Sequence, residues 1–492
     1  MKKIMVLMLI TSSVYSQAQF AGNSYVRWSL MDSVSVGNNC HVSGNGRYCL
    51  TGWSVNDQKV SFYDSTGSVP LWEYNASMNY SALSENGEIA ALASANDIYL
   101  LDKNNGAVLI DFNTSAIFPN TNNSGPLDIS STGDYIIASA VSGDTSRLFL
   151  FSKDNTGYIW QHGIPQIICG VKLSGNDSIV IINTYSKFYV YETYTGQFRF
   201  SGTIAGAENT MGTSGDGSVI ASIDLDGWLK VYHWTGTTYS LLWQRMEPPT
   251  QDYNWMTSVD ISYDGTMIAG GTLNFPSSTT YEGKVLLFKT FDGSTPVWTY
   301  SGFGSKVTSV SFSKNGKILA AASWGDINDT DNDLVIFNIL NNTNVPVFGI
   351  NSQGSLFCCA ASDDGTTVLA SGKAVHAQVY GMGGWMYNIA VDTSSASSGI
   401  NSNSNTGFAG QCYPNPVESK TTVSFKLSEK SFVSANLYDS DGNCIASLFN
   451  TVLDAGLHNA KFDFENFAQG CYFCKIITRN QSQTIKIVHN NN

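Results

Sequence analysis

The sequence predicts an all-β fold, and three observations support this prediction. The 492-residue chain holds 25 Phe, 24 Tyr and 11 Trp, whereas charged residues make up only 13%. A tetrapeptide with the chemistry of a tight turn recurs along residues 43–365. A second turn, set between apolar segments, follows most of its copies. Many short strands separated by tight turns are typical of such a chain.

The recurring tetrapeptide consists of Ser, any residue, Asn or Asp (once Thr), and Gly. Its copies are SGNG at 43–46, SENG at 84–87, SSTG at 130–133, SGND at 174–177, SGDG at 214–217, SYDG at 262–265, SKNG at 313–316 and SDDG at 362–365. They end 40 to 51 residues apart, a spacing typical of propeller blades. The Ser hydroxyl can cap a hairpin turn, and Gly takes the positive φ that returns the chain to the sheet. Asp177 replaces Gly in the fourth copy and is among the residue types that best tolerate that conformation.

A third strand, a second turn and a fourth strand are expected after each hairpin. The glycines that mark the second turn are Gly67, Gly106, Gly157, Gly196 and Gly293. A lone blade cannot bury both of its faces, so blades must stack around an axis. We therefore predict that residues 19–391 form a closed β-propeller of eight four-stranded blades, with seven blades as the alternative. Either YVRWSLM at 25–31 or WMYNIAV at 385–391 is expected to close the ring by joining the terminal blade.

Two segments of this repeat resemble known propeller families. ETYTGQFRF at 192–200 and DKNNGAVLI at 102–110 are similar to the Asp-x-x-Thr-Gly-x-x-x-Trp repeat of quinoprotein alcohol dehydrogenases and their non-catalytic relatives. The Ser-x-Asp-Gly hairpin resembles that of the WD-repeat family. These resemblances imply an architecture but no particular function, because such propellers host unrelated activities.

Residues 1–18 have the layout of a secretory signal peptide. Two lysines precede a short apolar run, and small residues follow it, so cleavage is expected between Ala18 and Gln19. The run is too short to span a bilayer, and no later stretch reaches that length. The net charge of −13 argues against nucleic acid and anionic membranes as partners. We therefore expect an exported protein without a membrane span.

The C-terminal fifth of the chain follows a different pattern. Residues 392–411 are rich in Ser, Asn and Gly and are expected to be a flexible linker. Residues 412–492 contain alternating strands around turns, which predicts a small antiparallel β-sandwich. This segment closely resembles the C-terminal sorting domain of the type IX (Por) secretion system of Bacteroidota. The matching residues include Tyr413, Pro414, Asn415, Pro416, Gly442, Gly470, Tyr472 and Lys486.

The second resemblance implies a destination for the protein. The type IX secretion machinery would be its partner, and the passenger would be secreted or displayed on the outer-membrane surface after crossing the periplasm. The family's sorting domains are removed after transport, so the mature chain is expected to lack residues from roughly 410 onward.

No residue pattern in the sequence indicates a reaction. Zinc-type His pairs, a nucleophile elbow, a phosphate loop and a dinucleotide fingerprint are all absent, so we predict no catalytic residue and no cofactor. Four side chains in the segment 324–334 offer oxygen ligands to Ca²⁺, although they do not fit the EF-hand pattern, and a solvated acidic loop is the alternative. These four are Asp326, Asn328, Asp331 and Asp333.

The cysteines suggest two further features. Cys358 and Cys359 are adjacent, like the vicinal disulfide that quinoprotein dehydrogenases carry beside their quinone, with two small buried residues as the alternative. Cys40 and Cys49 flank the first hairpin and are a candidate disulfide in an exported protein. A two-residue loop would pair them directly, whereas a three-residue bulged loop, which the Gly favours, would place Cys40 opposite Leu50.

The longest interruptions of the repeat are candidate binding loops. LNFPSSTTYEGK at 273–284 and WGDINDTDNDL at 324–334 both connect second and third strands, so both are expected at one face of the ring. They carry Phe275, Tyr281 and Trp324 for stacking. The sequence thus predicts a non-catalytic module that binds an extracellular polymer or protein, carbohydrate being one candidate. The alternative is a secreted enzyme, either a quinoprotein-like oxidoreductase or a hydrolase.

Overall fold

The computed structural model describes residues 24–393 apart from 77, 122, 156, 207–210, 248–253 and 278–279, and residues 410–490 apart from 414, 416, 418, 428–429, 440–443, 466 and 479–481. The expected cleavage site at Ala18 and Gln19 lies outside these residues, as does most of the expected linker. The chain divides into two compact units, Met1–Ala396 and Ser397–Asn492. Each unit is described by itself.

Strands β1–β32 of the first unit form eight four-stranded antiparallel sheets, named here sheet 1 to sheet 8 in chain order. Sheet 1 holds β2 (Ser35–Val42), β3 (Tyr48–Val55), β4 (Lys59–Asp64) and β5 (Trp72–Asn75). Sheet 2 holds β6 (Met78–Leu83), β7 (Ile89–Ser94), β8 (Asp97–Asp102) and β9 (Val108–Asn113). Sheet 3 holds β10 (Asn123–Ile129), β11 (Tyr135–Ser142), β12 (Thr145–Ser152) and β13 (Tyr158–Ile164). Sheet 4 holds β14 (Ile168–Leu173), β15 (Ile179–Thr184), β16 (Lys187–Glu192) and β17 (Phe198–Thr203).

The second half of the unit repeats this order. Sheet 5 holds β18 (Met211–Thr213), β19 (Val219–Ile223), β20 (Trp228–Trp234) and β21 (Tyr239–Met246). Sheet 6 holds β22 (Asn254–Ile261), β23 (Met267–Ser277), β24 (Thr280–Lys289) and β25 (Trp298–Phe303). Sheet 7 holds β26 (Val307–Phe312), β27 (Ile318–Ser323), β28 (Leu334–Asn338) and β29 (Phe348–Ile350). Sheet 8 holds β30 (Ser355–Ala361), β31 (Thr367–Lys373), β32 (Gly384–Ala390) and β1 (Tyr25–Asp32).

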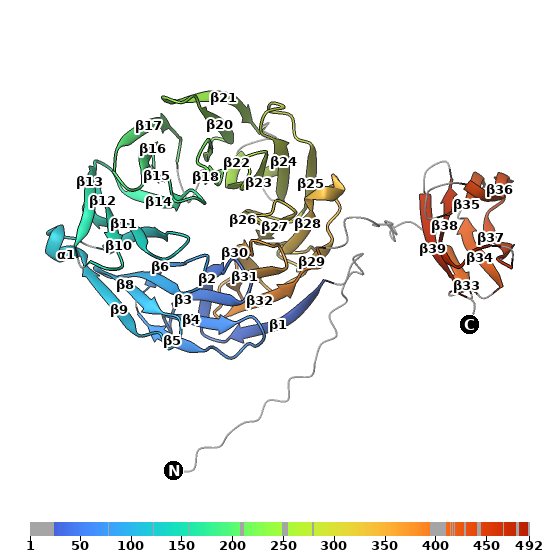
Figure 1. Ribbon diagram of the computed structural model, residues 1–492, viewed down its shortest axis with the longest axis horizontal. Coiled ribbons are helices and arrows are strands. Elements are labelled where there is room, and N and C mark those ends of the chain that lie inside the picture. The colour runs from blue at the N-terminus through green and yellow to red at the C-terminus, as the bar shows by residue number, and fades with distance from the viewer. Residues whose placement is uncertain are drawn as a thin grey trace, which may run out of the picture. The chain divides into compact units, whose positions relative to one another are not determined.

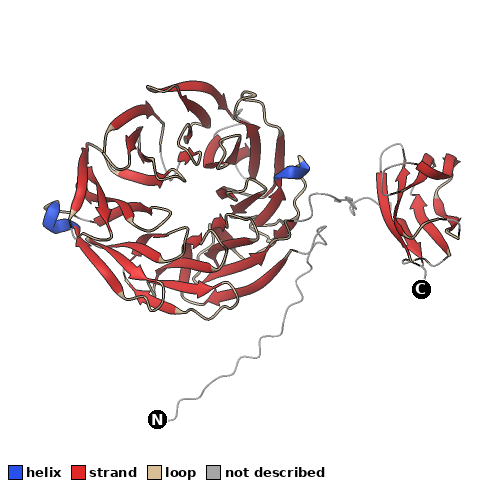
Figure 2. Ribbon diagram, viewed as in Figure 1, coloured by secondary structure: helices blue, strands red, loops and turns tan. Residues whose placement is uncertain are grey.

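The sheets follow one another around a common centre, with the first strand of each sheet innermost (Figure 1). This arrangement is consistent with propeller blades and confirms the all-β prediction. Helix is confined, in the described residues, to α1 (Thr114–Ile117) and the single 3₁₀ turn η1 (Ile339–Asn341) (Figure 2).

The ring is closed by the N-terminal strand. The segment 25–31 forms β1, which pairs antiparallel with β32 from Tyr25 opposite Ala390 to Asp32 opposite Gly384. Sheet 8 therefore combines three strands from the end of the unit with one from its beginning. The innermost strands β2 and β30 meet beside this join.

Each tetrapeptide forms the turn between the first two strands of a sheet. In the first copy, the Ser43 hydroxyl donates to Asn45 Oδ1 (2.8 Å) and accepts from the Tyr48 amide (2.9 Å). Gly46 has φ +70°, and its amide donates to the Ser43 carbonyl (2.8 Å). The amide of Ser43 also donates to the Tyr48 carbonyl (2.9 Å), so four residues form the loop. Asp177 takes the same left-handed conformation, with φ 59°.

Tryptophans on the fourth strands join neighbouring sheets. The indole N–H of four of them donates to a carbonyl in the second turn of the next sheet. The four bonds are Trp28 to Ser65 (2.8 Å), Trp72 to Lys103 (2.7 Å), Trp160 to Thr193 (2.7 Å) and Trp243 to Thr290 (2.7 Å). A Cβ on Gly106 would lie 2.8 Å from the Trp72 ring, and one on Gly196 would lie 2.9 Å from the Trp160 ring. In these two turns the tryptophan ring therefore fills the space that a side chain would need.

Apolar side chains fill the space between successive sheets. The second strands carry the densest core, and every residue of β7 and of β27 is buried. One hydrophobic cluster combines Leu100 and Phe112 of sheet 2 with Ile136 and Phe149 of sheet 3. Small residues such as Ala91 allow neighbouring sheets to approach closely at the ring's narrow inner side.

The second unit consists of two antiparallel sheets. One holds β33 (Gly410–Tyr413), β34 (Lys420–Leu427) and β37 (Gly456–Asp463). The other holds β35 (Ser431–Tyr438), β36 (Cys444–Leu453), β38 (Gly470–Ile477) and β39 (Ser482–His489). A single hydrophobic cluster includes Val423 and Phe425 from the first sheet with Leu437 and Ile476 from the second. Alternate residues of β34 are buried, as expected for a strand with one face in a core.

Candidate functional site

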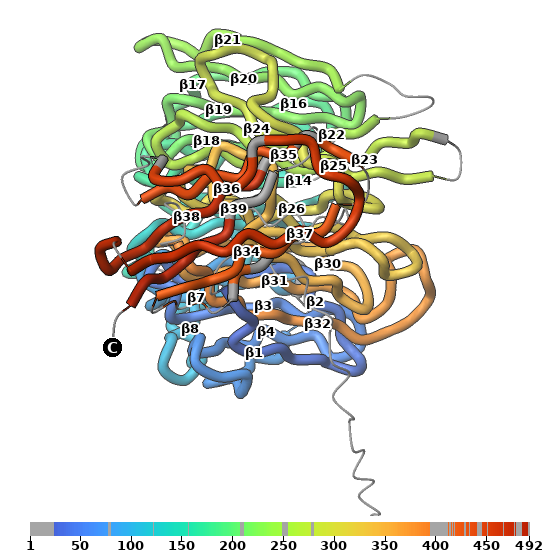
Figure 3. Tube along the Cα trace, turned by 90° about the vertical axis from the view of Figure 1, so that its right-hand side faces the viewer, coloured from blue at the N-terminus to red at the C-terminus, as the bar shows by residue number. Residues whose placement is uncertain are grey.

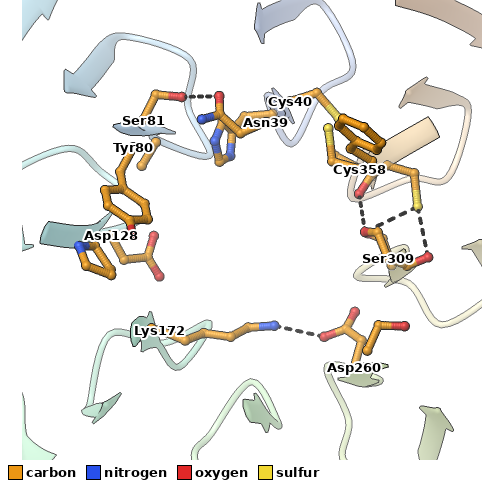
Figure 4. A pocket seen from close by; sticks show the side chains of 18 of the residues that line it. Asn39, Cys40, Tyr80, Ser81, Asp128, Lys172, Asp260, Ser309 and Cys358 are labelled. Atoms are coloured by element: carbon orange, nitrogen blue, oxygen red, sulfur yellow. Dashed lines mark hydrogen bonds and ion pairs between the residues drawn. The ribbon is translucent and has the colours of Figure 1, made fainter. Parts of the chain in front are cut away.

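A cavity of about 490 Å³ lies on the axis of the ring and is lined by the innermost strands of all eight sheets. Its polar and sulfur-bearing lining residues include Asn39, Cys40, His41, Tyr80, Ser81, Asp128, Lys172, Asp260, Ser309, Ser311 and Cys358 (Figure 4). This set was not predicted from the sequence. The only common signal was position, because most of these residues stand two to five places before a hairpin serine.

The hairpin end of the axis is occupied by side chains. The Lys314 ammonium of sheet 7 lies 2.6 Å from the Glu85 carboxylate of sheet 2 and 3.8 Å from that of Asp363. It also lies 4.7 Å from the ring centroid of Tyr263, which covers the glycines of two neighbouring hairpins. The contact between Lys314 and Glu85 joins hairpins of non-adjacent sheets, so it crosses the axis, whereas Asp363 and Tyr263 belong to the two sheets beside sheet 7. The hairpin loops themselves do not line the cavity.

The cavity continues into a second hollow toward the opposite face. This hollow measures about 410 Å³ and shares Asn38, Tyr80 and Pro126 with the axial cavity. It is also lined by Ser54 and Gln58, beside the connection between the second and third strands of sheet 1. A ligand entering from this face would therefore pass Tyr80 before it reached the deeper polar groups.

Three side chains of the cavity wall bind the backbone of the next sheet. Each stands two residues before a hairpin serine, and its partner amide stands one residue before the next hairpin serine. The bonds are Leu173 N to Asp128 Oδ2 (2.8 Å), Phe312 N to Asp260 Oδ2 (2.9 Å) and Ala361 N to Ser311 Oγ (3.2 Å). The Asp128 carboxylate also accepts from the Ile129 amide at 2.8 Å. These side chains therefore fasten neighbouring sheets together.

Lys172 occupies the same repeat position but reaches past the adjacent sheet. Its ammonium lies 2.9 Å from Asp260 Oδ1, so sheet 4 is linked to sheet 6 (Figure 4). The intervening sheet 5 has Gly212 at this position, which places no side chain in the path. Burial alone would lower the pKa of Lys172, but the attraction of Asp260 raises it instead. The cavity therefore holds a permanent positive charge beside a carboxylate.

Burial shifts the pKa values of two other titratable groups in the cavity wall. Burial raises the pKa of Asp128 to about 6, although its two backbone hydrogen bonds and Lys172 act in the opposite direction. Burial lowers the pKa of His41 to about 4. At neutral pH the cavity therefore presents a neutral imidazole, a carboxylate with an unusually high proton affinity, and an ion pair.

The predicted aromatic loop of 273–284 is largely strand. β23 and β24 extend into it and form a hairpin that projects beyond the neighbouring strands (Figure 3). Phe275 and Tyr281 contact each other with ring centroids 5.4 Å apart, and Trp255 contacts Phe275 at 5.6 Å. Trp255 belongs to β22 and was not singled out from the sequence. Trp324, in the other predicted loop, lies 5.3 Å from the Lys306 ammonium rather than in this aromatic group.

Two of the four candidate calcium ligands accept hydrogen bonds from backbone amides. Asp326 accepts hydrogen bonds from the amides of Asn328 and Thr330 within its own turn. Asp333 is 2% exposed and accepts from the Ser352 amide (2.5 Å), and burial together with the nearby acidic residues raises its pKa well above the ordinary value. Asp331 lies in the same loop, and its pKa is raised by burial and by Asp326. In the described residues, no group of three or more His, Cys, Asp or Glu side chains is placed to hold a metal ion.

The predicted pairing of Cys40 with Cys49 does not match the register. Cys40 lies opposite Thr51 and Cys49 opposite Val42, because the hairpin has a four-residue loop rather than the two or three residues considered. Both thiols are unbridged, and the thiol of Cys49 contacts the Asn388 amide (3.2 Å). The hairpin loop therefore has neither of the two lengths considered from the sequence, and the register gives no support to the candidate disulfide.

The adjacent cysteines of β30 face different neighbours. Cys358 Sγ contacts Ser371 Oγ (3.1 Å), whereas Cys359 Sγ contacts Ser309 of sheet 7 (3.6 Å). Successive strand residues point to opposite faces, which separates these sulfurs. Cys358 also packs against the hydrophobic cluster that contains Cys40, at the join between sheets 8 and 1.

Two of the expected sorting residues, Asn415 and Lys486, meet in the second unit. Asn415 donates to the Lys486 carbonyl (2.7 Å) and accepts from the Val488 amide (2.9 Å), so it holds the start of the unit against its last strand. Tyr472 is buried, and its hydroxyl donates to the Ala468 carbonyl (2.7 Å). Tyr413 ends β33 and Gly470 begins β38. Pro414, Pro416 and Gly442 lie outside the described residues.

The fold and cavity define a ring-forming all-β passenger unit, followed by a separate all-β unit at the C-terminus. Residues 411–490 match the family model described as the secretion system C-terminal sorting domain. This match supports the type IX sorting domain expected from the sequence, and it indicates a secreted or cell-surface protein that interacts with that machinery. No curated protein matches the chain. Among the described residues, none of the helices has the length and apolar character needed to cross a membrane.

Proposed function

We propose that this protein is an exported, non-catalytic binding module whose first unit is an eight-bladed β-propeller. In this proposal sheets 1 to 8 are the blades, because each carries one copy of the hairpin motif and β1 completes the last sheet. The second unit is a β-sandwich that directs transport across the outer membrane. Residues 1–18 act as the signal peptide for the earlier step into the periplasm, and the cell belongs to the Bacteroidota.

The axial cavity is the proposed ligand site, and the polar side chains that line it are the main observation in support of this proposal. A formed cavity with a few convergent polar groups is the usual place for a ligand. The Lys172 ammonium has three donors, and Asp260 is the acceptor that the described contacts give it. Tyr80 stands at the mouth, and Phe357 adds a second aromatic ring to the lining. Ammonium donors beside aromatic faces suit the hydroxyl groups and apolar ring faces of a carbohydrate chain end.

The carboxylates favour binding over catalysis. Both oxygens of Asp128 accept backbone hydrogen bonds, and the oxygens of Asp260 accept from Lys172 and from the Phe312 amide. A general acid or nucleophile needs an oxygen that can face substrate. These groups instead hold the sheets together, which leaves Lys172 and the aromatic rings for recognition.

A hydrolase is the second candidate, and one observation favours it. Asp128, with a pKa of about 6, shares the cavity with Asp260, and a pair of carboxyl groups is the usual machinery of glycoside hydrolysis, with a raised pKa on the general acid. Hydrolysis of a bound glycan that disappears in Asp128→Asn, with unchanged folding, would establish the enzyme instead of the binding module.

The test is a screen of the purified propeller-containing chain on glycan and peptide arrays, followed by titration calorimetry. Lys172→Met and Tyr80→Ala should each weaken binding of the best ligand by about tenfold or more, the cost of one lost charged hydrogen bond or stacking contact. Lys187→Met makes the same chemical change on the exposed part of β16 and should bind normally. Equal binding by all three variants would place the ligand elsewhere.

The hairpin formed by β23 and β24 is the alternative ligand site to the axial cavity. Phe275→Ala and Trp324→Ala alter the two loops predicted from the sequence without touching the cavity lining. Loss of binding in these variants, with normal binding in Lys172→Met, would assign the ligand to the rim of the ring. Circular dichroism spectra that match the unmodified protein are required of every variant.

A further inference from the structure

The join between sheet 8 and sheet 1 is where the two ends of the first unit meet. Sheet 8 contains β1 from the start of the unit, and the Asp363 amide of one hairpin donates to the Gly44 carbonyl of the other (2.9 Å). Arg27 of β1 adds hydrogen bonds to Thr367 Oγ1 (2.9 Å) and Asn388 Oδ1 (3.1 Å). All of these contacts are non-covalent, so opening of the ring is expected to begin at this join or at another equally weak boundary.

Two cysteines face each other across this join. Cys40 lies on β2 and Cys358 on β30, the adjacent innermost strands of sheets 1 and 8. Both side chains line the axial cavity (Figure 4). Cys40 is 6% exposed and belongs to the hydrophobic cluster against which Cys358 packs. The fold thus brings together two cysteines that are 318 positions apart in the sequence (358 minus 40).

The two other thiols near this join, those of Cys49 and Cys359, contact other side chains. Cys49 contacts the Asn388 side chain, and Cys359 contacts Ser309 on the far side of β30. Burial would raise the pKa of Cys358, but the neighbouring Cys40 thiol and hydrogen bonding to Ser371 lower it, whereas burial raises the pKa of Cys40. Cys358 is therefore the better nucleophile of the pair, since the thiolate is the reactive form.

We propose that Cys40 and Cys358 form a disulfide during export, which closes the ring covalently between its first and last sheets. The proposal depends on transport through an oxidising compartment, as the sorting domain indicates. The oxidant is a disulfide of a protein or a small thiol. Cys358 thiolate attacks that disulfide and expels one thiolate, and Cys40 then loses its proton and attacks the mixed disulfide, releasing the second thiol. The cysteine pair loses two electrons and two protons, and the oxidant gains them as two thiols.

The bond would act mainly on the unfolded chain. It encloses a loop of more than three hundred residues (from 40 to 358), and a longer loop loses more conformational freedom when its ends are tied. We expect the oxidised protein to unfold about 5 °C higher than the same protein in reductant. Cys40→Ser should unfold at one temperature in both conditions.

Tryptic mapping without reductant tests the pairing on full-length protein incubated with oxidised glutathione. Cys40 falls in the peptide 28–47, Cys49 in 48–59, and Cys358 and Cys359 together in 318–373. The linked peptides 28–47 and 318–373 should appear in the unmodified protein and in Cys359→Ser. They should be absent in Cys358→Ser and Cys40→Ser, which serve as matched controls.

Two results would overturn the proposal. One is recovery of 28–47 with its cysteine alkylated, from unmodified protein that was oxidised before denaturation. The other is a link that survives in Cys358→Ser, because Cys359 would then be the partner. Neither result depends on the ligand, so failure of this proposal is distinguishable from failure of the proposed binding function.

Discussion

Several polar side chains in the cavity wall stabilise the fold as well as line the cavity, because they hydrogen-bond the backbone of the next sheet. Asp128 illustrates this, because its carboxylate accepts two backbone hydrogen bonds and one of them comes from the next sheet. Burial nevertheless makes its charged form costly, so its pKa rises to about 6. Asp128 therefore links two sheets, and its burial favours the protonated form of the carboxyl group.

This predicts a pH dependence of stability. The folded-state pKa of Asp128 is higher than the unfolded one, so its stabilising contribution is present below about pH 4 and is lost as the pH rises through about 6. Relative to Asp128→Asn, the unmodified protein should therefore lose roughly 1–3 kcal/mol of unfolding free energy across that window. Urea denaturation at a series of pH values measures it. Thr145→Ser, an exposed change on the same sheet that removes no titratable group, should show no such trend relative to the unmodified protein.

A second prediction concerns the Lys172–Asp260 pair. Asp260→Ala removes the ammonium's partner and leaves the Phe312 amide without its acceptor, so it should cost about 1–3 kcal/mol of unfolding free energy. Lys172→Met leaves the Asp260–Phe312 bond intact and loses a partly exposed ion pair, so it should cost less than about 1 kcal/mol. Chemical denaturation of both variants checks the order. Equal losses would mean that the backbone bond contributes little.

At the scale of the element, the hairpin is the unit on which the fold is built. Its glycine has positive φ in seven of the eight copies, and Asp177 occupies the eighth. Asp177 also accepts hydrogen bonds from the amide and hydroxyl of Ser131 in the preceding hairpin. The exception to the repeat therefore gains a contact that glycine could not make.

Substitutions at two glycines with the same backbone conformation allow the cost of backbone strain to be distinguished from the cost of a steric clash. Gly316 (φ +70°) has open space where a Cβ would lie, so Gly316→Ala should cost only the backbone strain, about 1–2 kcal/mol. Gly87 (φ +72°) would place a Cβ 2.8 Å from the Tyr48 ring, so Gly87→Ala should destabilise the protein further. Thermal or urea unfolding of the two variants tests this. A smaller loss for Gly87→Ala would show that the Tyr48 ring moves aside freely.

At the scale of the whole chain, two units with separate cores serve separate steps. The first unit carries the cavity, and the second carries the match to the sorting domain. Asn415 ties the start of the second unit to β39 near Lys486, so residues that resemble the sorting motif also hold that unit together.

Export should therefore depend on the second unit and leave the first intact. Deletion of residues 411–490 should trap the protein in the periplasm, because the outer-membrane machinery would lack its recognition domain. Intact mass spectrometry of the exported protein should show a chain that ends near residue 410. Recovery of exported protein that still carries KIVHNNN would contradict the removal of this unit, and export of the deletion variant would contradict its role.

The sequence by itself determined the local structure of this protein. The hairpin serine, its acidic or amide neighbour and the glycine act within five residues through short-range hydrogen bonds and allowed φ values, so the turns, the strands beside them and the all-β class could be predicted from the pattern. The sorting domain could also be predicted from the sequence, because its matching residues lie within one short segment.

Only the tertiary structure decided which distant residues meet. The four-residue hairpin loop displaced Cys40 from Cys49, and ring closure brought Cys40 to Cys358 instead. The Lys172–Asp260 pair, 88 positions apart, depends on a glycine in the sheet between them. Periodicity predicts that sheets stack around an axis, but it does not fix which side chains point at the axis or across the join. The cavity and its chemistry arise only when the innermost strands of all the sheets face one centre.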